Sequence, residues 1–206
     1  IVTLTVNNKN VKPSFIDRKN DGEIEMMSSG DGDDEVGFYS VIEKLDLSNF
    51  NTSKVTNMER MFYSCSSLTN LDLNNFNTSS VANMQRMFYR CSSLTSLDLS
   101  GFNTSKVTDM YEMFDDCSSL TSLELNNFNT SSVTDMSWMF HNCKKLQTQI
   151  NIMNEGINDY SCMFQAALTD PDAYVIIGYT TETQSIAEAM KSTAGSSSSK
   201  ITLKQI

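Results

Sequence analysis

Four carboxylates at a fixed spacing of 26 residues are the side chains of this sequence best placed to do chemistry. They are Asp46, Asp72, Asp98 and Glu124. On neighbouring parallel strands such side chains would lie about 4.8 Å apart, and each neighbouring pair would repel by roughly 0.9 kcal/mol even in water. A basic partner or Ca²⁺ would relieve this repulsion, so the four carboxylates form a candidate binding site. The alternative interpretation is a solvated acidic face that keeps a sheet soluble.

Paired carboxylates also suggest an enzyme, because a retaining glycosidase needs two of them about 5 Å apart. Asp72 and Asp98 have that spacing in principle, so a polysaccharide-cleaving enzyme is an alternative. However, the residues around them are small and polar, and no aromatic pocket adjoins them that would keep one of the two protonated. His141 is the only histidine, which leaves little material for a nucleophilic triad. The sequence has no glycine-rich phosphate loop and no Cys/His metal set, and we predict no catalytic residues, metal site or cofactor.

The four carboxylates belong to a 26-residue unit that occurs four times between residues 45 and 148, without insertion or deletion. The first copy reads LDLSNFNTSKVTNMERMFYSCSSLTN and the second LDLNNFNTSSVANMQRMFYRCSSLTS. A fixed period of this size is typical of a solenoid, in which each repeat buries its apolar face only against its neighbours. One repeat alone should not fold, because ordering each residue costs roughly 1–2 kcal/mol and burying each apolar side chain returns only about 1.5–3 kcal/mol.

Two periodicities alternate inside each repeat. Leu71 and Leu73, two residues apart, predict a short strand with Asp72 pointing outward. The apolar residues that follow recur at spacings of three and four, which predicts a helix of two to three turns. In the second repeat these are Val81, Met84, Met87, Phe88 and Cys91. The predicted fold is therefore an α/β solenoid with a parallel β-sheet.

The sequence on either side of the regular repeats predicts one continuous domain. Residues 1–44 are interpreted as an N-terminal cap that begins with a strand and ends in a degenerate first turn, because its last apolar residues fall in step with the repeat. Residues 149–206 are interpreted as degenerate repeats and a C-terminal cap. In this part, the pair Tyr174-x-Ile176 is aligned with the two strand leucines of a regular repeat, and residues 201–206 with the strand of one more unit.

Four of the five cysteines share one position of the repeat. They are Cys65, Cys91, Cys117 and Cys143. Side chains stacked in parallel rarely meet the dihedral angle that a disulfide needs, so we interpret these residues as buried free thiols. Disulfides between neighbouring repeats are the alternative. Cys162 lies outside this column and is the better candidate for a reactive thiol.

A further column consists of asparagines, each in an N-T-S triplet. They are Asn51, Asn77, Asn103 and Asn129. The triplet matches the N-glycosylation acceptor, although a repeated sequence produces such coincidences trivially. We interpret the column as an inward ladder of asparagines, with the neighbouring Thr and Ser residues satisfying backbone groups of the turn.

The outward positions of the predicted helices change from repeat to repeat and form a second candidate surface. One position holds Arg60, Arg86, Glu112 and Trp138, and the position three residues later holds Tyr63, Tyr89, Asp115 and His141. Tyr89 and Trp138 are the candidate contacts for a partner, because aromatic side chains often dominate the binding energy of an interface. Single exposed aromatic residues are also common without any function.

The composition argues against some partners. A net charge of −10 opposes binding to the phosphates of nucleic acid or to an anionic membrane surface. No apolar run reaches 18 residues, so we predict no transmembrane helix and no membrane insertion. The chain begins IVTLTVNN, without Met and without the features of a signal peptide. We interpret this start as the result of processing or truncation.

The segment NFNTSKVTNMERMFYSCSSLTNLDL, with its pattern V-T-x-M-x-x-M-F-x-x-C-x-x-L, resembles the repeat of the BspA-like leucine-rich-repeat surface proteins of bacteria. The resemblance covers about residues 36–169. It implies a right-handed horseshoe with a parallel sheet on the concave face, short helices on the convex face, and no catalytic residues. It also implies an extracellular or cell-surface location and adhesion to host or matrix proteins.

From the residues and this resemblance together, we predict a non-catalytic protein-binding module. Its partner would be a host or extracellular-matrix protein, with a glycan as a further option. Asp46, Asp72, Asp98 and Glu124 would line the concave face, and Tyr89 and Trp138 the convex face. A structural spacer, which holds another module away from a cell wall, is the alternative, and a polysaccharide-cleaving solenoid is a weaker one.

Overall fold

The computed structural model describes residues 3–6, 9–11, 16–18, 24–26, 42–48, 50–125 and 127–206. Its strands are β1 (Thr3–Val6), β2 (Lys9–Val11), β3 (Ile16–Arg18), β4 (Ile24–Met26), β5 (Lys44–Asp46), β6 (Ser96–Asp98), β7 (Ser122–Glu124), β8 (Gln147–Ile152), β9 (Tyr174–Tyr179) and β10 (Ile201–Gln205). The helices of the described residues are α1 (Gln184–Ser192) and the 3₁₀ helix η2 (Gly195–Lys200). Much of the predicted N-terminal cap, including its degenerate turn, lies outside the described residues.

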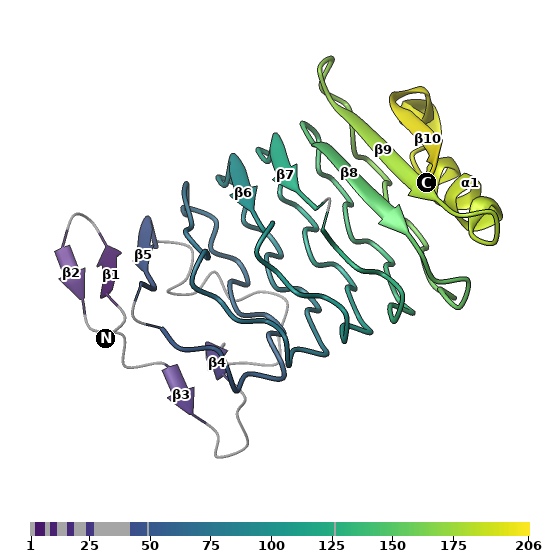
Figure 1. The fold of residues 1–206 in the computed structure, drawn as a ribbon. Helices are drawn as coiled ribbons and strands as arrows, with labels where there is room; N and C mark the ends of the chain where they lie inside the picture. Colours follow the sequence, from purple (N-terminus) through teal and green to yellow (C-terminus); the bar gives the residue numbers. More distant parts are fainter. Residues whose placement is uncertain are drawn as a thin grey trace.

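Five strands form a parallel sheet in the order β10-β9-β8-β7-β6, along one side of the stacked repeats (Figure 1). Leu97 lies opposite Leu123, which lies opposite Thr148, and the row continues to Val175 and Ile201. In β6 and β7 the central leucine is buried and both neighbours are exposed, as the sequence predicts. The fold is a five-stranded parallel sheet with few helices, which is compatible with an α/β solenoid.

The N-terminal strands form two smaller antiparallel sheets. One has the order β2-β1-β5, and the other pairs β3 with β4. The strand predicted at the start of the chain is thus β1, and its Thr3 lies opposite Asp46 of β5. In the second repeat, Leu71 and Leu73 are buried and Asp72 is exposed as in the other repeats, although this segment is not a strand.

The helix predicted after each strand is wrong for the regular repeats, because these segments form tight turns instead. The turn wall, as we call it, comprises residues 57–66, 83–92, 109–118, 135–144 and 159–168. In its first segment the N–H groups of Met61, Tyr63 and Cys65 donate to the carbonyl three residues earlier, at 3.3, 3.1 and 3.3 Å. An α-helix would use the carbonyl four residues earlier.

Every turn-wall segment has two residues with a left-handed backbone, and the last segment has a third, Leu168, with φ of 57°. These conformations prevent a helix. In the first segment the two residues are Arg60 and Ser64, both with φ of 57°. The equivalent residues are Arg86, Arg90, Glu112, Asp116, Trp138, Asn142, Cys162 and Ala166. Each such conformation costs an L-residue roughly 1–2 kcal/mol. The turns compensate by directing backbone N–H groups toward the neighbouring repeat.

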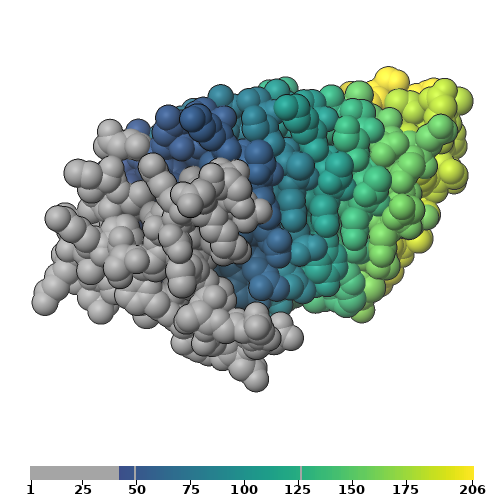
Figure 2. All heavy atoms as spheres, turned by 90° about the horizontal axis from the view of Figure 1, so that it is seen from below, coloured from purple at the N-terminus to yellow at the C-terminus, as the bar shows by residue number. Residues whose placement is uncertain are grey.

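Backbone hydrogen bonds join each turn-wall segment to the next one. The N–H groups of Met58, Arg60, Phe62 and Ser64 donate to the carbonyls of Asn83, Gln85, Met87 and Tyr89, at 2.9, 2.9, 2.8 and 2.7 Å. The later repeats follow the same pattern. At the first junction one bond runs the other way, from the Ala82 N–H to the Thr56 carbonyl at 2.8 Å. Successive repeats consequently appear as successive bands on the molecular surface (Figure 2).

The buried columns agree with the sequence prediction. Phe62, Phe88, Phe114, Phe140 and Phe164 stack through the core, with ring centroids 5.4 to 5.7 Å apart. The nine methionines of the turn wall are almost fully buried beside them. The spacing of three and four therefore marks a buried face correctly, but a face made of turns rather than of helix.

The cysteine column is buried and carries free thiols, as predicted. The Sγ of Cys91 lies 3.1 Å from the carbonyl oxygen of Phe62, and that of Cys117 lies 3.1 Å from the carbonyl oxygen of Phe88. Burial raises the pKa of the Cys65 thiol to about 12 and also raises the pKa values of Cys91 and Cys117. These thiols stay protonated, and those of Cys91 and Cys117 bond to the preceding repeat.

The asparagine column points outward, so the predicted inward ladder is wrong. Asn51, Asn77 and Asn103 are exposed, and each accepts the N–H two residues later, as Asn77 does from Ser79 at 3.0 Å. The inward residue is the threonine of each triplet. Thr52 is 1% exposed, and its hydroxyl accepts the Asn77 N–H at 2.7 Å and donates to the Asn77 carbonyl at 3.1 Å.

The degenerate repeats continue the sheet with a register that differs from the prediction. Tyr174 of β9 lies opposite Gln147 of β8 and is exposed, whereas Val175 and Ile177 are buried. The predicted alignment of Tyr174 and Ile176 with buried leucines is therefore wrong by one residue, which exchanges the two faces of the strand. β10 pairs in parallel with β9, so the last predicted strand is confirmed.

Candidate binding surfaces

The four carboxylates of the sequence analysis are all exposed, and we call them the acidic column. They are Asp46, Asp72, Asp98 and Glu124. Asp98 and Glu124 lie opposite each other at the ends of β6 and β7, so neighbouring strands bring these two together. Asp46 ends β5, which among the described strands pairs with β1. Asp72 occupies the equivalent position in the repeat that lies between those of Asp46 and Asp98.

The aspartates of the acidic column also have a local structural task. Each accepts the backbone N–H two residues later: Ser48 on Asp46 at 3.0 Å, Asn74 on Asp72 at 3.0 Å, and Ser100 on Asp98 at 2.9 Å. Such bonds fix the turn after a strand. They all use the Oδ1 atom of the carboxylate.

These hydrogen bonds offset the repulsion expected from the sequence. The backbone N–H and the hydroxyl of Ser48 lower the pKa of Asp46. The hydroxyl and the backbone N–H of Ser100 lower the pKa of Asp98 in the same way. Because hydrogen bonds to the charged form favour ionisation, these two carboxylates are held ionised at neutral pH.

Tyr89 lies on the turn wall and contacts its neighbours on several sides. Its ring stacks on that of Tyr63 with centroids 4.8 Å apart. The guanidinium of Arg90 lies 5.0 Å from the ring centroid and that of Arg86 lies 6.0 Å away. Burial raises the pKa of Tyr89 to about 12. Much of the Tyr89 ring is therefore in contact with side chains of the same chain.

Trp138 also has partners on the turn wall. It meets the His141 ring edge-on, with centroids 4.8 Å apart. His141 Nδ1 lies 2.6 Å from Asp115 Oδ1 in the preceding repeat, and Asp115 is 5% exposed. Burial raises the pKa of Asp115 to about 6, although the hydrogen bond with His141 acts in the opposite direction.

Further charged pairs join the variable positions of neighbouring repeats. Arg86 Nε lies 2.7 Å from Glu112 Oε2, and Arg90 Nε lies 3.6 Å from Asp116 Oδ2. The Arg86 guanidinium also lies 5.1 Å from the ring centroid of Tyr111. The side chains that vary at these positions thus form oppositely charged pairs between neighbouring repeats. The signal was present in the sequence as opposite charges 26 residues apart, at 86 and 112 and at 90 and 116.

Other kinds of site receive no support from the described part of the chain. No group of three or more His, Cys, Asp and Glu side chains gathers there in a way that could hold a metal ion. No helix in that part is long and apolar enough to cross a membrane. Cys162 is half-buried on the turn wall, unlike the fully buried column cysteines.

Comparison with known families adds one match. The profile described as "Mycoplasma protein of unknown function, DUF285" matches residues 36–153 and again residues 92–200. The chain belongs to the DUF285 family. Two overlapping matches are expected where a family consists of repeats, because the same profile fits at more than one register. No curated protein and no solved structure matches the DUF285 chain.

The DUF285 match covers both candidate surfaces. It includes all four carboxylates of the acidic column, and also Tyr89 and Trp138. It extends through β8, β9 and α1, which agrees with the continuation of the repeats beyond the regular part. The family description assigns no activity, so function is argued below from the surfaces themselves.

Proposed function

We propose that this chain is a non-catalytic protein-binding module of a bacterial cell-surface protein, and that it adheres to a host or extracellular-matrix protein. We further propose that its repeats form a solenoid related to the BspA-like leucine-rich-repeat proteins. The acidic column is the proposed contact. Its support is that four exposed carboxylates recur once per repeat on a scaffold whose apolar columns are all buried.

The chemistry of the acidic column favours a basic protein surface. Each aspartate is exposed, and its carboxylate can accept a hydrogen bond from a Lys or Arg of the partner in addition to the bond from its own backbone. Charge-assisted hydrogen bonds of this kind are about twice as strong as neutral ones. Because the column is solvent-exposed, salt should screen the attraction, with a Debye length of about 8 Å at physiological ionic strength.

Binding to immobilised matrix and mucosal proteins tests this proposal, with the double variant Asp72→Asn/Asp98→Asn. Asparagine keeps the Oδ1 acceptor for the Asn74 and Ser100 N–H groups and removes only the charge. A matched control is Asp159→Asn, since Asp159 is an exposed carboxylate on the turn wall that accepts the Ser161 N–H at 3.0 Å.

The wild type and the control should bind at least one basic matrix protein saturably, and the double variant should bind it at least tenfold more weakly. Raising NaCl from 50 to 500 mM should weaken wild-type binding and leave the residual binding of the double variant nearly unchanged. Equal affinity of the three proteins would contradict the role of the acidic column. Absence of any saturable protein ligand would contradict the binding module and favour the structural spacer.

A further inference from the structure

The outward face of β8 and β9 differs chemically from the acidic column. The two strands read QTQINI and YVIIGY and contain no Asp, Glu, Lys, Arg or His, in a chain of net charge −10. They are also the longest strands of the described chain, with six residues each. The acidic column ends on the adjoining strand β7, at Glu124. A long uncharged face therefore begins where the acidic column stops.

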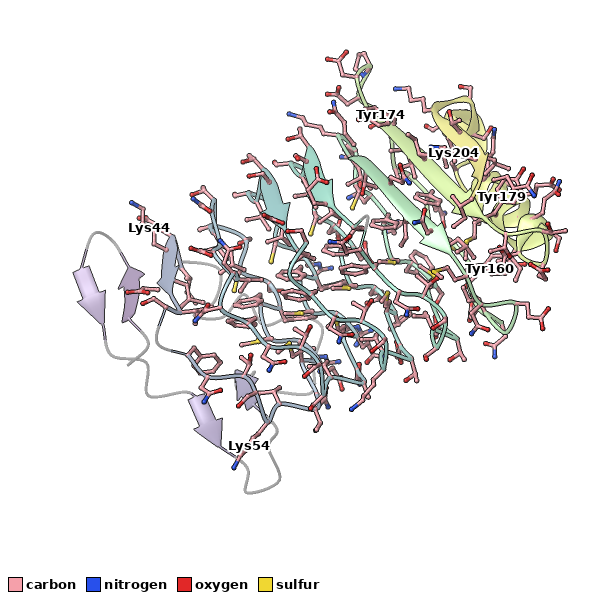
Figure 3. The ribbon with its side chains drawn as sticks, viewed as in Figure 1. Lys44, Lys54, Tyr160, Tyr174, Tyr179 and Lys204 are labelled. Atoms are coloured by element: carbon pink, nitrogen blue, oxygen red, sulfur yellow. The ribbon has the colours of Figure 1, made fainter. Side chains whose placement is uncertain are left out.

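The register of these strands places planar polar side chains beside an aromatic ring. Gln147 lies opposite Tyr174, and Gln149 lies opposite Ile176. All four residues are on the outward face, since the alternate residues of both strands are buried. Tyr174 is 48% exposed, and it lies at the start of β9 with Lys204 on the neighbouring strand (Figure 3). The face is flanked by charge but is itself neutral.

The amide groups of this face are held in fixed orientations. Gln147 Nε2 donates to the Asp172 carbonyl at 3.1 Å, and Gln149 Nε2 donates to Asn151 Oδ1 at 3.3 Å. Asn151 in turn lies across Gly178, where a Cβ would come within 2.2 Å of its Oδ1. Glycine at 178 therefore gives the Asn151 amide the room to lie over β9. Each glutamine retains one amide hydrogen and its Oε1 outside these bonds.

We propose that this face binds a neutral oligosaccharide. A side-chain amide offers a donor and an acceptor in one plane, which matches the adjacent hydroxyl groups of a sugar. The exposed ring of Tyr174 offers an apolar surface with a polar tip, against which the C–H face of a sugar can pack. An uncharged ligand suits a face without charge, whereas an acidic polysaccharide would be repelled by the net charge of the chain.

This proposal concerns a different surface and a different class of ligand from the acidic column. The oligosaccharide site and the protein-binding site can therefore be tested independently. The test is affinity electrophoresis of the whole chain in gels that contain a soluble neutral polysaccharide: mixed-linkage β-glucan, arabinoxylan or galactomannan. Polygalacturonate serves as the acidic probe. The variants are Tyr174→Ala and Gln149→Ala, with Tyr174→Phe as the conservative control and Asp159→Asn as the remote control.

At least one neutral polysaccharide should retard the wild type, Tyr174→Phe and Asp159→Asn equally. Tyr174→Ala and Gln149→Ala should each bind that polysaccharide about tenfold more weakly, with unchanged circular dichroism. The proposal is overturned if no neutral polysaccharide retards the wild type, if both alanine variants bind like the wild type, or if only polygalacturonate is bound. It is also overturned if Tyr174→Ala weakens only the protein binding described above, because the face would then be a protein contact.

Discussion

The Thr78 hydroxyl bonds to both backbone polar groups of Asn103 in the next repeat. It accepts the Asn103 N–H at 2.8 Å and donates to the Asn103 carbonyl at 3.1 Å, while the threonine itself is 1% exposed. One side chain thus satisfies a donor and an acceptor that the neighbouring backbone would otherwise leave unpaired. Thr52 and Thr104 do the same in their repeats.

Replacing Thr78 by Val should be strongly destabilising, although the two side chains have nearly the same shape. Two part-buried backbone groups of Asn103 would lose their partner, at about 1–3 kcal/mol each. The expected loss in free energy of unfolding is about 2–4 kcal/mol, measured by urea denaturation. Thr78→Ser, which keeps the hydroxyl, should lose less than half as much. Equal losses for the two variants would contradict the role of the hydroxyl.

Asp115 should make stability depend on pH. Its pKa is raised to about 6 in the folded protein, from 3.8, chiefly by burial. Between these values the folded state holds a proton that the unfolded state has lost, so the free energy of unfolding falls as pH rises from 4 to 6. Asp115→Asn removes this effect. Relative to the wild type, the variant should gain roughly 1–3 kcal/mol between pH 4 and pH 7, as measured by urea denaturation at each pH. A difference that stays constant with pH would contradict this assignment.

The five cysteines should fall into two classes toward a thiol reagent. Cys65, Cys91, Cys117 and Cys143 are buried, and burial raises their pKa values, whereas Cys162 is half-buried. Because the thiolate is the reactive form, Ellman's reagent should label one thiol of the native protein and all five in 6 M guanidinium. Cys162→Ser should abolish the native reaction. Two or more thiols that react before unfolding would contradict the buried column.

Ala166→Gly should stabilise the protein. Ala166 is exposed and has φ of 57°, a conformation that glycine adopts without the steric cost paid by alanine. Relief of that cost exceeds the added entropy of the unfolded chain, which leaves a gain of roughly 0.5–1 kcal/mol. The control is Ala82→Gly, at an exposed alanine outside the left-handed set, which should be destabilising by a similar amount. The two changes should therefore shift the urea midpoint in opposite directions.

The buried part of the fold could be predicted from sequence because its residues occupy equivalent positions in successive repeats. Leu97, Phe88, Met87 and Cys91 recur every 26 residues and are all buried. The helix was mispredicted because a period of three and four residues does not distinguish a helix from turns that bury the same side chains. The left-handed backbone at residues such as Arg86 and Arg90 distinguishes these turns from a helix. The sequence does not signal this conformation there, because neither position holds the glycine or asparagine that usually adopts it.

The candidate surfaces were predictable only in part. The exposure of Asp72 and Asp98 follows from strand alternation, but their hydrogen bonds to the backbone depend on turn geometry that a repeat pattern does not specify. The side chains around Tyr89 and Trp138 come from neighbouring repeats, so their pairing needs the stacking to be known. The neutral face beside Tyr174 was missed because the strand was aligned one residue out of register.

The turn wall has a direction. From Met58 to Asn142, its inter-repeat N–H groups point toward the C-terminal repeats and the accepting carbonyls face the N-terminal ones. One reversed bond crosses each of the first three junctions, and three reversed bonds, from the N–H groups of Asn158, Asp159 and Leu168, cross the last. In ordinary sheets, opposed strand dipoles largely cancel, whereas here most peptide dipoles add. The two ends of the wall are consequently not interchangeable: an added repeat must bring acceptors to one end and donors to the other. The two ends of the stack therefore differ in the backbone groups that they present. Two copies that joined through the ends of their turn walls would have to do so head to tail.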